Sequence, residues 1–227
     1  MKTKHLRLMQ RVYIILFFCF MYLPIAYMIV FSFNQSKGYA LFTGFTFKWY
    51  PSLFHNASIL RALAVSVEVA LISAVIATIL GTAASLGIAS MGRKSRLVVT
   101  NITYIPVVNP EIITGISLML MFVFFGRLLG ASTSLGFWSM LAAHITFCLP
   151  YVILSVLPKL RQMNPNLFEA AQDLGCPPVR AFFKVVLPEI MPGIVTGMIM
   201  AFTLSIDDFV ISYFTAGTSA STLAMTI

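Results

Sequence analysis

Apolar runs of membrane-spanning length alternate with short polar segments along the whole chain. A bilayer core about 30 Å thick requires about 20 consecutive apolar residues in a helix, and five runs reach this length. They cover about residues 12–33, 61–91, 97–125, 138–157 and 191–215. Since helices are the usual way for such runs to cross a membrane, the pattern predicts an all-α polytopic membrane protein.

Composition supports this class and argues against a soluble domain. Hydrophobic residues make up 59% of the chain, charged residues 10%, and the mean hydropathy is +0.93. Soluble domains are nearer half apolar and a quarter charged. The net charge of +8 is compatible with nucleic-acid binding, but most basic residues flank apolar runs. That placement is typical of topology signals, so we predict membrane lipid and no nucleic acid as partners.

The basic residues also predict an orientation. Eleven lie on one side of the predicted spans, in the N-terminal segment, the turn at 92–96 and the loop after the fourth span, whereas the opposite side carries four: Lys37, Lys48, Arg61 and Arg127. Cytoplasmic loops carry the excess of Lys and Arg. The first apolar run is too long for a typical signal-peptide core. We therefore predict an uncleaved first span with a cytoplasmic N-terminus.

The longest polar interruption, residues 164–188, lies on the predicted cytoplasmic side. Asn164 can cap a helix, Pro165 suits its first turn, and Gly175 supplies a stop. After Cys176-Pro177-Pro178 a second periodic run begins. The segment predicts two short helices that meet at a sharp turn. The first has an apolar face made of Leu167, Ala170, Ala171 and Leu174.

This loop resembles the EAA loop of binding-protein-dependent ABC importer permeases. The resemblance rests on Glu169-Ala170-Ala171, on Gly175 and on Val185-Val186-Leu187-Pro188, although the family prefers Ile at the position of Val185. It implies that the loop, at about residues 158–190, docks on a cytoplasmic ATPase subunit. The implied ATPase-coupling residues are Glu169, Ala170, Ala171, Asp173, Gly175, Leu187 and Pro188.

The resemblance has further implications for architecture and partners. It implies a type I ABC importer (MetI-like) permease fold, with residues 1–227 forming a single transmembrane permease domain. The family usually has a sixth span, which we expect and do not find in this chain. The implied partners are a homologous second permease, two ATPase subunits that bind ATP-Mg, and an extracytoplasmic substrate-binding protein. The implied location is the bacterial inner membrane.

Acidic residues occur in or beside the apolar runs, where they are costly. Asp at the centre of a membrane helix costs about 2.5–3.5 kcal/mol, so such residues face a wet cavity, a substrate or a partner. The four are Glu68, Glu111, Asp207 and Asp208. Glu68 fits the pathway, the headgroup region or a pair with Arg61. Two interpretations of the aspartates remain open: substrate contact, and a structural role in interhelical hydrogen bonding or in packing against a partner subunit.

Two features favour a cationic substrate. The fifth run contains no basic residue to pair with the aspartates, and Phe209 and Tyr213 are close enough in sequence to add aromatic faces for an ammonium group. Pro106 and Asn109-Pro110 interrupt the third run just before Glu111, and discontinuous helices are where transporters place substrate-facing groups. The predicted substrate-binding residues are Glu111, Asp207, Asp208, Phe209 and Tyr213.

Residues 204–214 and 109–115 resemble the same regions of spermidine/putrescine importer permeases. The resemblance implies polyamine transport by alternating access. Permeases for other small solutes share much of the pattern, so a different solute remains an alternative. A passive channel and an intramembrane protease are alternatives of other classes. A channel has no need of an ATPase-docking loop, and a protease would need a Ser/His pair or two aspartates in different spans.

No nucleotide-binding or hydrolase signature is present in the chain. We therefore predict a non-catalytic subunit that binds no cofactor or metal itself. The three cysteines have no metal-site or disulfide-framework spacing. His144 lies alone in the fourth span, where a hydrogen-bonded packing residue is commoner than a proton relay. Small residues at Ala77-x-x-x-Gly81, Ala83-x-x-x-Gly87 and Gly193-x-x-x-Gly197 predict close helix contacts.

Overall fold

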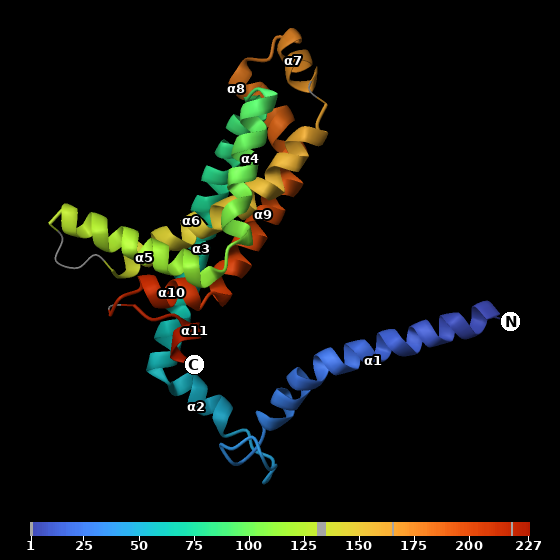
Figure 1. Ribbon diagram of the computed structural model, residues 1–227, viewed down its shortest axis with the longest axis vertical. Helices are drawn as coiled ribbons and strands as arrows, with labels where there is room; N and C mark the ends of the chain where they lie inside the picture. The colour runs from blue at the N-terminus through green and yellow to red at the C-terminus, as the bar shows by residue number, and fades with distance from the viewer. Residues whose placement is uncertain (1, 131–134, 165, 219) are drawn as a thin grey trace. The chain divides into compact units, whose positions relative to one another are not determined.

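The computed structural model describes residues 2–130, 135–164, 166–218 and 220–227, with side chains from Met9 onward. Within these ranges the chain is all-α, and a single β-bridge joins Asn34 and Phe45. The helices (Figure 1) are α1 (Lys2–Phe31), α2 (Trp49–His55), α3 (Ala57–Ser90), α4 (Arg93–Val108), α5 (Glu111–Leu128), α6 (Phe137–Gln162), α7 (Asn166–Asp173), α8 (Pro178–Ala181), the π-helix η1 (Phe182–Val186), α9 (Leu187–Asp207), α10 (Val210–Thr215) and α11 (Leu223–Thr226).

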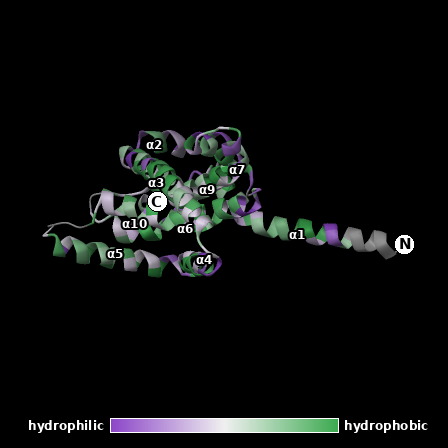
Figure 2. Cartoon of the chain, turned by 90° about the horizontal axis from the view of Figure 1, so that it is seen from above, coloured by the Kyte–Doolittle hydropathy of each residue, from purple (hydrophilic) through white to green (hydrophobic). Residues whose placement is uncertain are grey.

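Five helices of the described part are long and apolar enough to cross a membrane. They correspond one to one with the five predicted runs, so the all-α multi-pass class is confirmed. Apolar residues cover the long helices over most of their length, as Figure 2 shows in green. The five are Met9–Phe31, Ala57–Ser90, Glu111–Leu128, Phe137–Gln162 and Pro178–Asp207.

Two of the predicted runs have different boundaries in the structure. The third run, 97–125, is split into α4 and α5, and the break falls at Asn109-Pro110 while Pro106 stays inside α4. Pro110 is the N-cap of α5, where its missing N–H costs nothing. The fifth run, predicted at 191–215, begins at Pro178 and ends at Asp207.

The polar loop contains both predicted helix starts, at α7 and at Pro178, but the second helix is not a separate short one. Residues 178–207 form one continuous helical rod, made of α8, the π-helical turn η1 and α9. Pro177 and Pro178 stand at the start of this rod, where proline is tolerated. The loop therefore leads directly into the fifth span without a second hinge.

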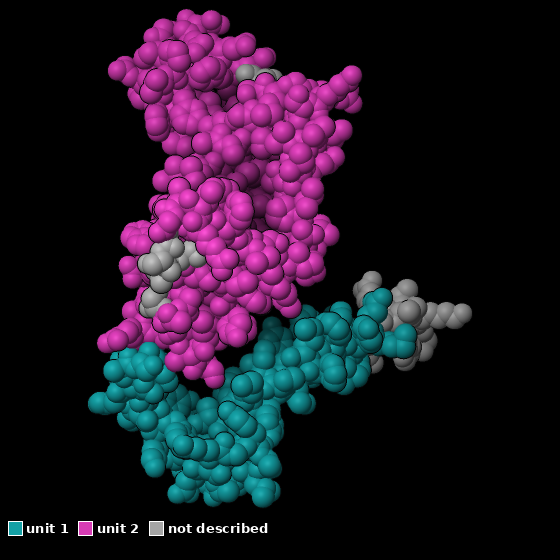
Figure 3. Space-filling view, turned by 60° about the vertical axis from the view of Figure 1, so that its left-hand side comes forward, with its two compact units in different colours: residues 1–60 teal, residues 61–227 magenta. Residues whose placement is uncertain are grey.

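The chain divides into two compact units, Met1–Leu60 and Arg61–Ile227 (Figure 3). The first unit contains α1 and α2, joined by a loop that is organised around the buried side chain of Asn34. Its Nδ2 donates to the carbonyls of Gly38 and Leu41, and its Oδ1 accepts from the Thr43 N–H at 2.8 Å. The backbone carbonyl of Asn34 accepts from the Trp49 indole at 2.8 Å.

The second unit is built around α6, the helix with the most buried residues. Small residues on α3 and α9 let these helices pack closely on it. An added Cβ on Gly81 would lie 2.7 Å from Val152 Cγ1, and one on Gly193 would lie 2.9 Å from the Ser155 carbonyl. The predicted close contacts at Gly81 and Gly193 are therefore confirmed.

The other predicted small-residue motif on α3 faces away from the unit. An added Cβ on Gly87 would meet no atom within 4 Å, and Ala83 is exposed. The same substitution can therefore be compared at a packed position, Gly81, and at an open position, Gly87, of one helix.

We expect Gly81→Ala to destabilise the protein by about 1–3 kcal/mol, the usual effect of overpacking. Its Cβ would force apart the α3–α6 contact at Val152. Gly87→Ala adds the same methyl group in open space and is expected to have no effect or a slight stabilising one. Thermal unfolding of the two purified variants measures the difference, and equal melting temperatures would contradict the packing argument.

Candidate substrate site and coupling loop

The fifth span ends at Asp207, and the next residue breaks the helix. Asp208 has an extended backbone (φ −70°, ψ 124°), and α10 begins two residues later at Val210. The Asp208 carboxylate accepts hydrogen bonds from the backbone N–H groups of Ile211 (3.3 Å) and Ser212 (2.8 Å). These N–H groups belong to the first turn of α10, whose donors lack helical partners. Asp208 therefore caps α10.

The capping carboxylate is buried, with only 2% of its side chain exposed. In return, the Ser212 hydroxyl donates to the Asp208 carbonyl at 3.3 Å. Each residue thus satisfies a backbone group of the other. Of the two interpretations that the sequence left open for Asp208, the geometry fits the structural one.

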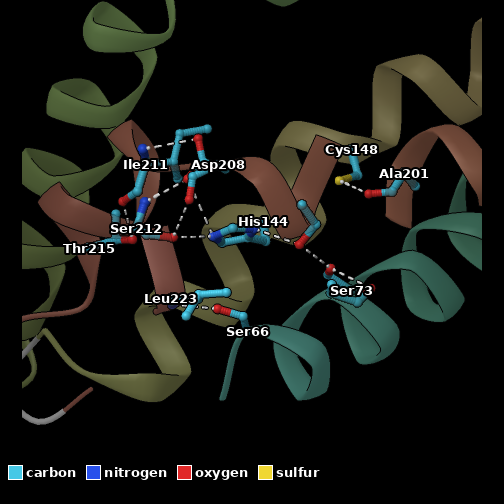
Figure 4. A network of polar contacts seen from close by, with 12 residues as sticks. Ser66, Ser73, His144, Cys148, Ala201, Asp208, Ile211, Ser212, Thr215 and Leu223 are labelled. Atoms are coloured by element: carbon cyan, nitrogen blue, oxygen red, sulfur yellow. Dashed lines mark hydrogen bonds and ion pairs between the residues drawn. The ribbon is translucent and has the colours of Figure 1, made fainter. Parts of the chain in front are cut away.

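His144 of α6 lies against this break and is completely buried. Its Nδ1 lies 2.7 Å from the Ser205 hydroxyl and its Nε2 lies 3.0 Å from the Ser212 hydroxyl. Nε2 is also 3.6 Å from the Asp208 carboxylate. On the far side, the Ser73 hydroxyl of α3 donates to Ser205 at 3.0 Å. Figure 4 shows these side chains as one connected polar network within the second unit.

Asp207, in contrast, is exposed. Two aromatic side chains near it in sequence are also accessible, since Phe209 is 47% and Tyr213 is 59% exposed. Their rings stack, with centroids 5.6 Å apart and an interplanar angle of 29°. The break in the fifth span therefore places an acidic side chain and an aromatic pair on the accessible surface of this unit.

Glu111 begins α5, directly after the break in the third span, and is exposed. One turn later on the same helix, an added Cβ on Gly115 would lie 3.1 Å from the Phe214 ring and 3.5 Å from the Val210 carbonyl of α10. The start of α5 thus packs against α10, and the two helix breaks lie in the same region (Figure 1).

Four of the five predicted substrate residues are therefore accessible, and one is buried. Glu111, Asp207, Phe209 and Tyr213 come from the two breaks, and contact between them and a substrate stays a prediction. Glu68, the remaining acid of the spans, is exposed on α3 and forms no ion pair with Arg61 within the part of the chain that the structure describes. The serines around His144 were not predicted from the sequence.

The predicted coupling loop contains one short helix, α7, with a cap at each end. The Asn164 side chain accepts from the Asn166 N–H at 3.0 Å, which confirms the predicted cap, while Pro165 lies outside the described residues. Gly175 ends the helix at φ +81°, a left-handed conformation that favours glycine. The Cys176 N–H donates to the Ala171 carbonyl at 3.1 Å and completes the stop.

Helix α7 exposes most of its apolar face. Leu174 is 89% exposed, and Leu167 and Ala170 are also exposed, while Ala171 is partly buried. The acidic Glu169 and Asp173 are exposed on the same short helix. At the other end of the motif, Leu187 is half-buried and Pro188 is exposed in the first turn of α9. Within the described residues, η1 and α8 contact α7 but leave Leu167, Ala170 and Leu174 accessible.

Comparisons with known proteins agree in fold and in sequence. The family described as "Binding-protein-dependent transport system inner membrane component" matches residues 75–227. The putrescine transport system permease protein PotI of Escherichia coli (strain K12) is 38% identical over 218 residues, which cover 95% of this chain and 77% of PotI. The spermidine/putrescine transport system permease protein PotC of Haemophilus influenzae is 33% identical over 219 residues, covering 96% and 83%.

The fold is shared with a solved transporter of much lower sequence identity. A crystal structure of a bacterial ABC transporter involved in the import of the acidic polysaccharide alginate matches with a TM-score of 0.75 and 16% identity. The match covers 99% of this chain and 81% of that one. A second crystal structure, of a bacterial alginate ABC transporter in complex with its pentasaccharide-bound periplasmic protein, matches with a TM-score of 0.73 and 18% identity. The likeness supports the type I permease fold.

Proposed function

The chain belongs to the family of binding-protein-dependent transport system inner membrane components, and we propose that it is the permease subunit of an ATP-driven importer of polyamines. The observation that carries the substrate class is the exposure of two acidic side chains and a stacked aromatic pair at the two helix breaks. The spermidine and putrescine permeases among its relatives support the same class.

These accessible acids and aromatic rings suit an alkyl chain with an ammonium group at each end. A carboxylate can bind an ammonium group through charge-assisted hydrogen bonds, and Asp207 and Glu111 supply two carboxylates from different helices. The face of Tyr213 or Phe209 attracts a cation by about 0.5–2 kcal/mol. Since α9 beyond Pro188 and all of α10 contain no Lys or Arg, no neighbouring base on these helices neutralises the acids. Asp208 holds the break and leaves substrate contact to its neighbour.

The transport cycle proposed here is alternating access driven from the cytoplasm. The apolar face of α7 docks in a partner ATPase, and a few residues link α7 to the rod at 178–207. Displacement of α7 therefore reaches Asp207 through one continuous helical segment. ATP-Mg binds to the two ATPase partners, and this non-catalytic chain contributes no nucleotide site. A homologous second permease completes the pathway, and an extracytoplasmic binding protein delivers the substrate.

The family description and the Escherichia coli relative support a bacterial inner-membrane location, and the distribution of basic residues supports a cytoplasmic N-terminus. The N-terminal segment, the turn at 92–96 and the loop around α7 carry eleven Lys and Arg residues. These segments then share the side on which the ATPase partners reside.

Uptake competition tests the proposed substrate class. The chain is assembled with its partner subunits in proteoliposomes, and uptake of radiolabelled putrescine is measured against unlabelled competitors. Spermidine and putrescine are expected to compete strongly. A neutral sugar and an acidic oligosaccharide are expected to leave uptake unchanged, because the exposed acids do not attract them. Equal competition by the neutral solute would reject the polyamine assignment.

A further inference from the structure

The polar network around His144 joins four helices at the point where the fifth span breaks. His144 belongs to α6, Ser205 to α9 and Ser73 to α3, while Ser212 belongs to α10. All four side chains are buried. Buried hydroxyl and imidazole groups are costly unless each is hydrogen-bonded. Each donor in the network therefore needs an acceptor.

One assignment of the protons gives every member of this network a partner; the Ser73 hydroxyl has a second acceptor within reach, the Ala70 carbonyl at 3.2 Å. The Ser73 hydroxyl donates to Ser205, and the Ser205 hydroxyl donates to His144 Nδ1. The ring proton then sits on Nε2 and points to the Ser212 oxygen, which is free to accept because the Ser212 hydroxyl donates to the Asp208 carbonyl. In this assignment the hydrogen bonds from Ser205 through His144 to the Asp208 carbonyl run in one direction, and the imidazole carries a single ring proton.

The last acceptor of this hydrogen-bonded chain is the backbone at the break itself. In an uninterrupted helix the Asp208 carbonyl would accept from the Ser212 N–H, but that N–H donates to the Asp208 carboxylate instead. The Ser212 hydroxyl replaces the missing donor. The geometry at residue 208 thus depends on Ser212, and the place of Ser212 depends on His144.

We propose that His144 is a positioning residue that fixes the geometry of the α9–α10 break and thereby the orientation of the Asp207 side chain. It touches no substrate. When the helical segment 178–207 moves, the α9–α10 break keeps its local geometry, because His144 of α6 holds both sides of the break by hydrogen bonds. This inference rests on the proposed function for its transport readout and on geometry alone for its structural readout.

Two substitutions at residue 144 test the contacts of the two ring nitrogens separately. An Asn amide can occupy the place of Nδ1 and keep the contact with Ser205, but it is too short to reach Ser212. A Gln amide reaches the place of Nε2 and keeps the contact with Ser212. Because the proposal depends on the contact with Ser212 at the break, His144→Asn is expected to raise the KM for putrescine about tenfold. His144→Gln is expected to stay within about threefold of the unchanged protein.

The transport measurement uses the assembled complex in proteoliposomes and reports KM and the maximal rate separately. We expect the KM to rise in His144→Asn while the maximal rate and the amount of complex change little. Ser85→Ala is the matched control, because Ser85 is equally buried but bonds only to the backbone carbonyls of Gly81 and Ile153. Ser212→Ala is expected to raise the KM as His144→Asn does, and the double variant should show no further increase.

A second readout does not depend on the substrate. Nitroxide labels at the exposed positions Thr203 and Thr218 flank the break, in a background with Cys19 and Cys176 replaced by Ser and the buried Cys148 retained. The label-to-label distance distribution is expected to broaden in His144→Asn and to stay narrow in His144→Gln and Ser85→Ala. An unchanged distribution in His144→Asn would overturn the proposal. A broadened distribution without any effect of Asp207→Asn on uptake would keep the positioning role and reject the polyamine site.

Discussion

Replacement of Asp207 by Asn is expected to lower polyamine uptake at subsaturating substrate by about 10- to 100-fold, with normal amounts of assembled complex. Hydrogen bonds to charged groups contribute about 1.5–3 kcal/mol, and each 1.4 kcal/mol corresponds to a factor of about ten. Asp207 is exposed, and its side chain makes no hydrogen bond within the part of the chain that the structure describes. The fold therefore does not depend on it. Initial uptake rates against putrescine concentration give the measurement.

Two further variants serve as controls for this expectation. Asp207→Glu keeps the charge and is expected to retain much of the uptake. Asp208→Asn should act differently, because an amide can accept from only one of the N–H groups of Ile211 and Ser212 and presents a donor to the other. It should cost about 1–3 kcal/mol of stability and reduce the amount of folded protein. Normal uptake by Asp207→Asn would remove the substrate role of this residue.

Local features of the chain were predictable from the sequence because they depend on neighbouring residues. The apolar runs marked all five spanning helices, and Asn164 and Gly175 marked the ends of α7. Each signal is contained within a short window. The Asn109-Pro110 pair likewise placed the break in the third run, since proline cannot continue the hydrogen bonding of a preceding helix.

The end of the fifth span was not predictable in the same way. The apolar run continues past Asp208 to about residue 215, so hydropathy gives no boundary. The helix ends where it does because the Asp208 side chain takes hydrogen bonds that the backbone would otherwise make. This capping is coupled to residues far away in the sequence: Ser73 lies 132 residues from Ser205, and His144 lies 68 residues from Ser212.

The sequence also did not predict which of the adjacent residues Asp207 and Asp208 is buried. Two adjacent aspartates look equivalent in the sequence, yet one is buried and the other is exposed. Adjacent helical residues point about 100° apart, and the break after Asp207 separates them further. Helical periodicity predicts only that the two side chains need not face the same cavity. Which one turns inward depended on the position of α6 and its histidine.

The second large effect is expected at α7, where Leu174→Asp should abolish coupled transport. Leu174 is 89% exposed and supports nothing in this chain, so the variant should fold and insert normally. Full burial of a leucine in a partner groove contributes about 1.5–3 kcal/mol, and an unpaired carboxylate there adds a desolvation cost. Docking should weaken at least about tenfold, and substrate-stimulated ATP hydrolysis by the reconstituted complex should fall in parallel with uptake.

The control for this variant lies at the far end of α5. Leu129 is 82% exposed and lies beside Arg127, on the predicted outer side of the membrane, so Leu129→Asp should leave hydrolysis coupled to uptake. Glu169→Ala removes an exposed acid of α7 without adding charge and is expected to give a milder loss than Leu174→Asp. If Leu174→Asp retained substrate-stimulated hydrolysis, α7 would not be the ATPase-docking element, and the continuous rod at 178–207 would lose its role in carrying motion to Asp207.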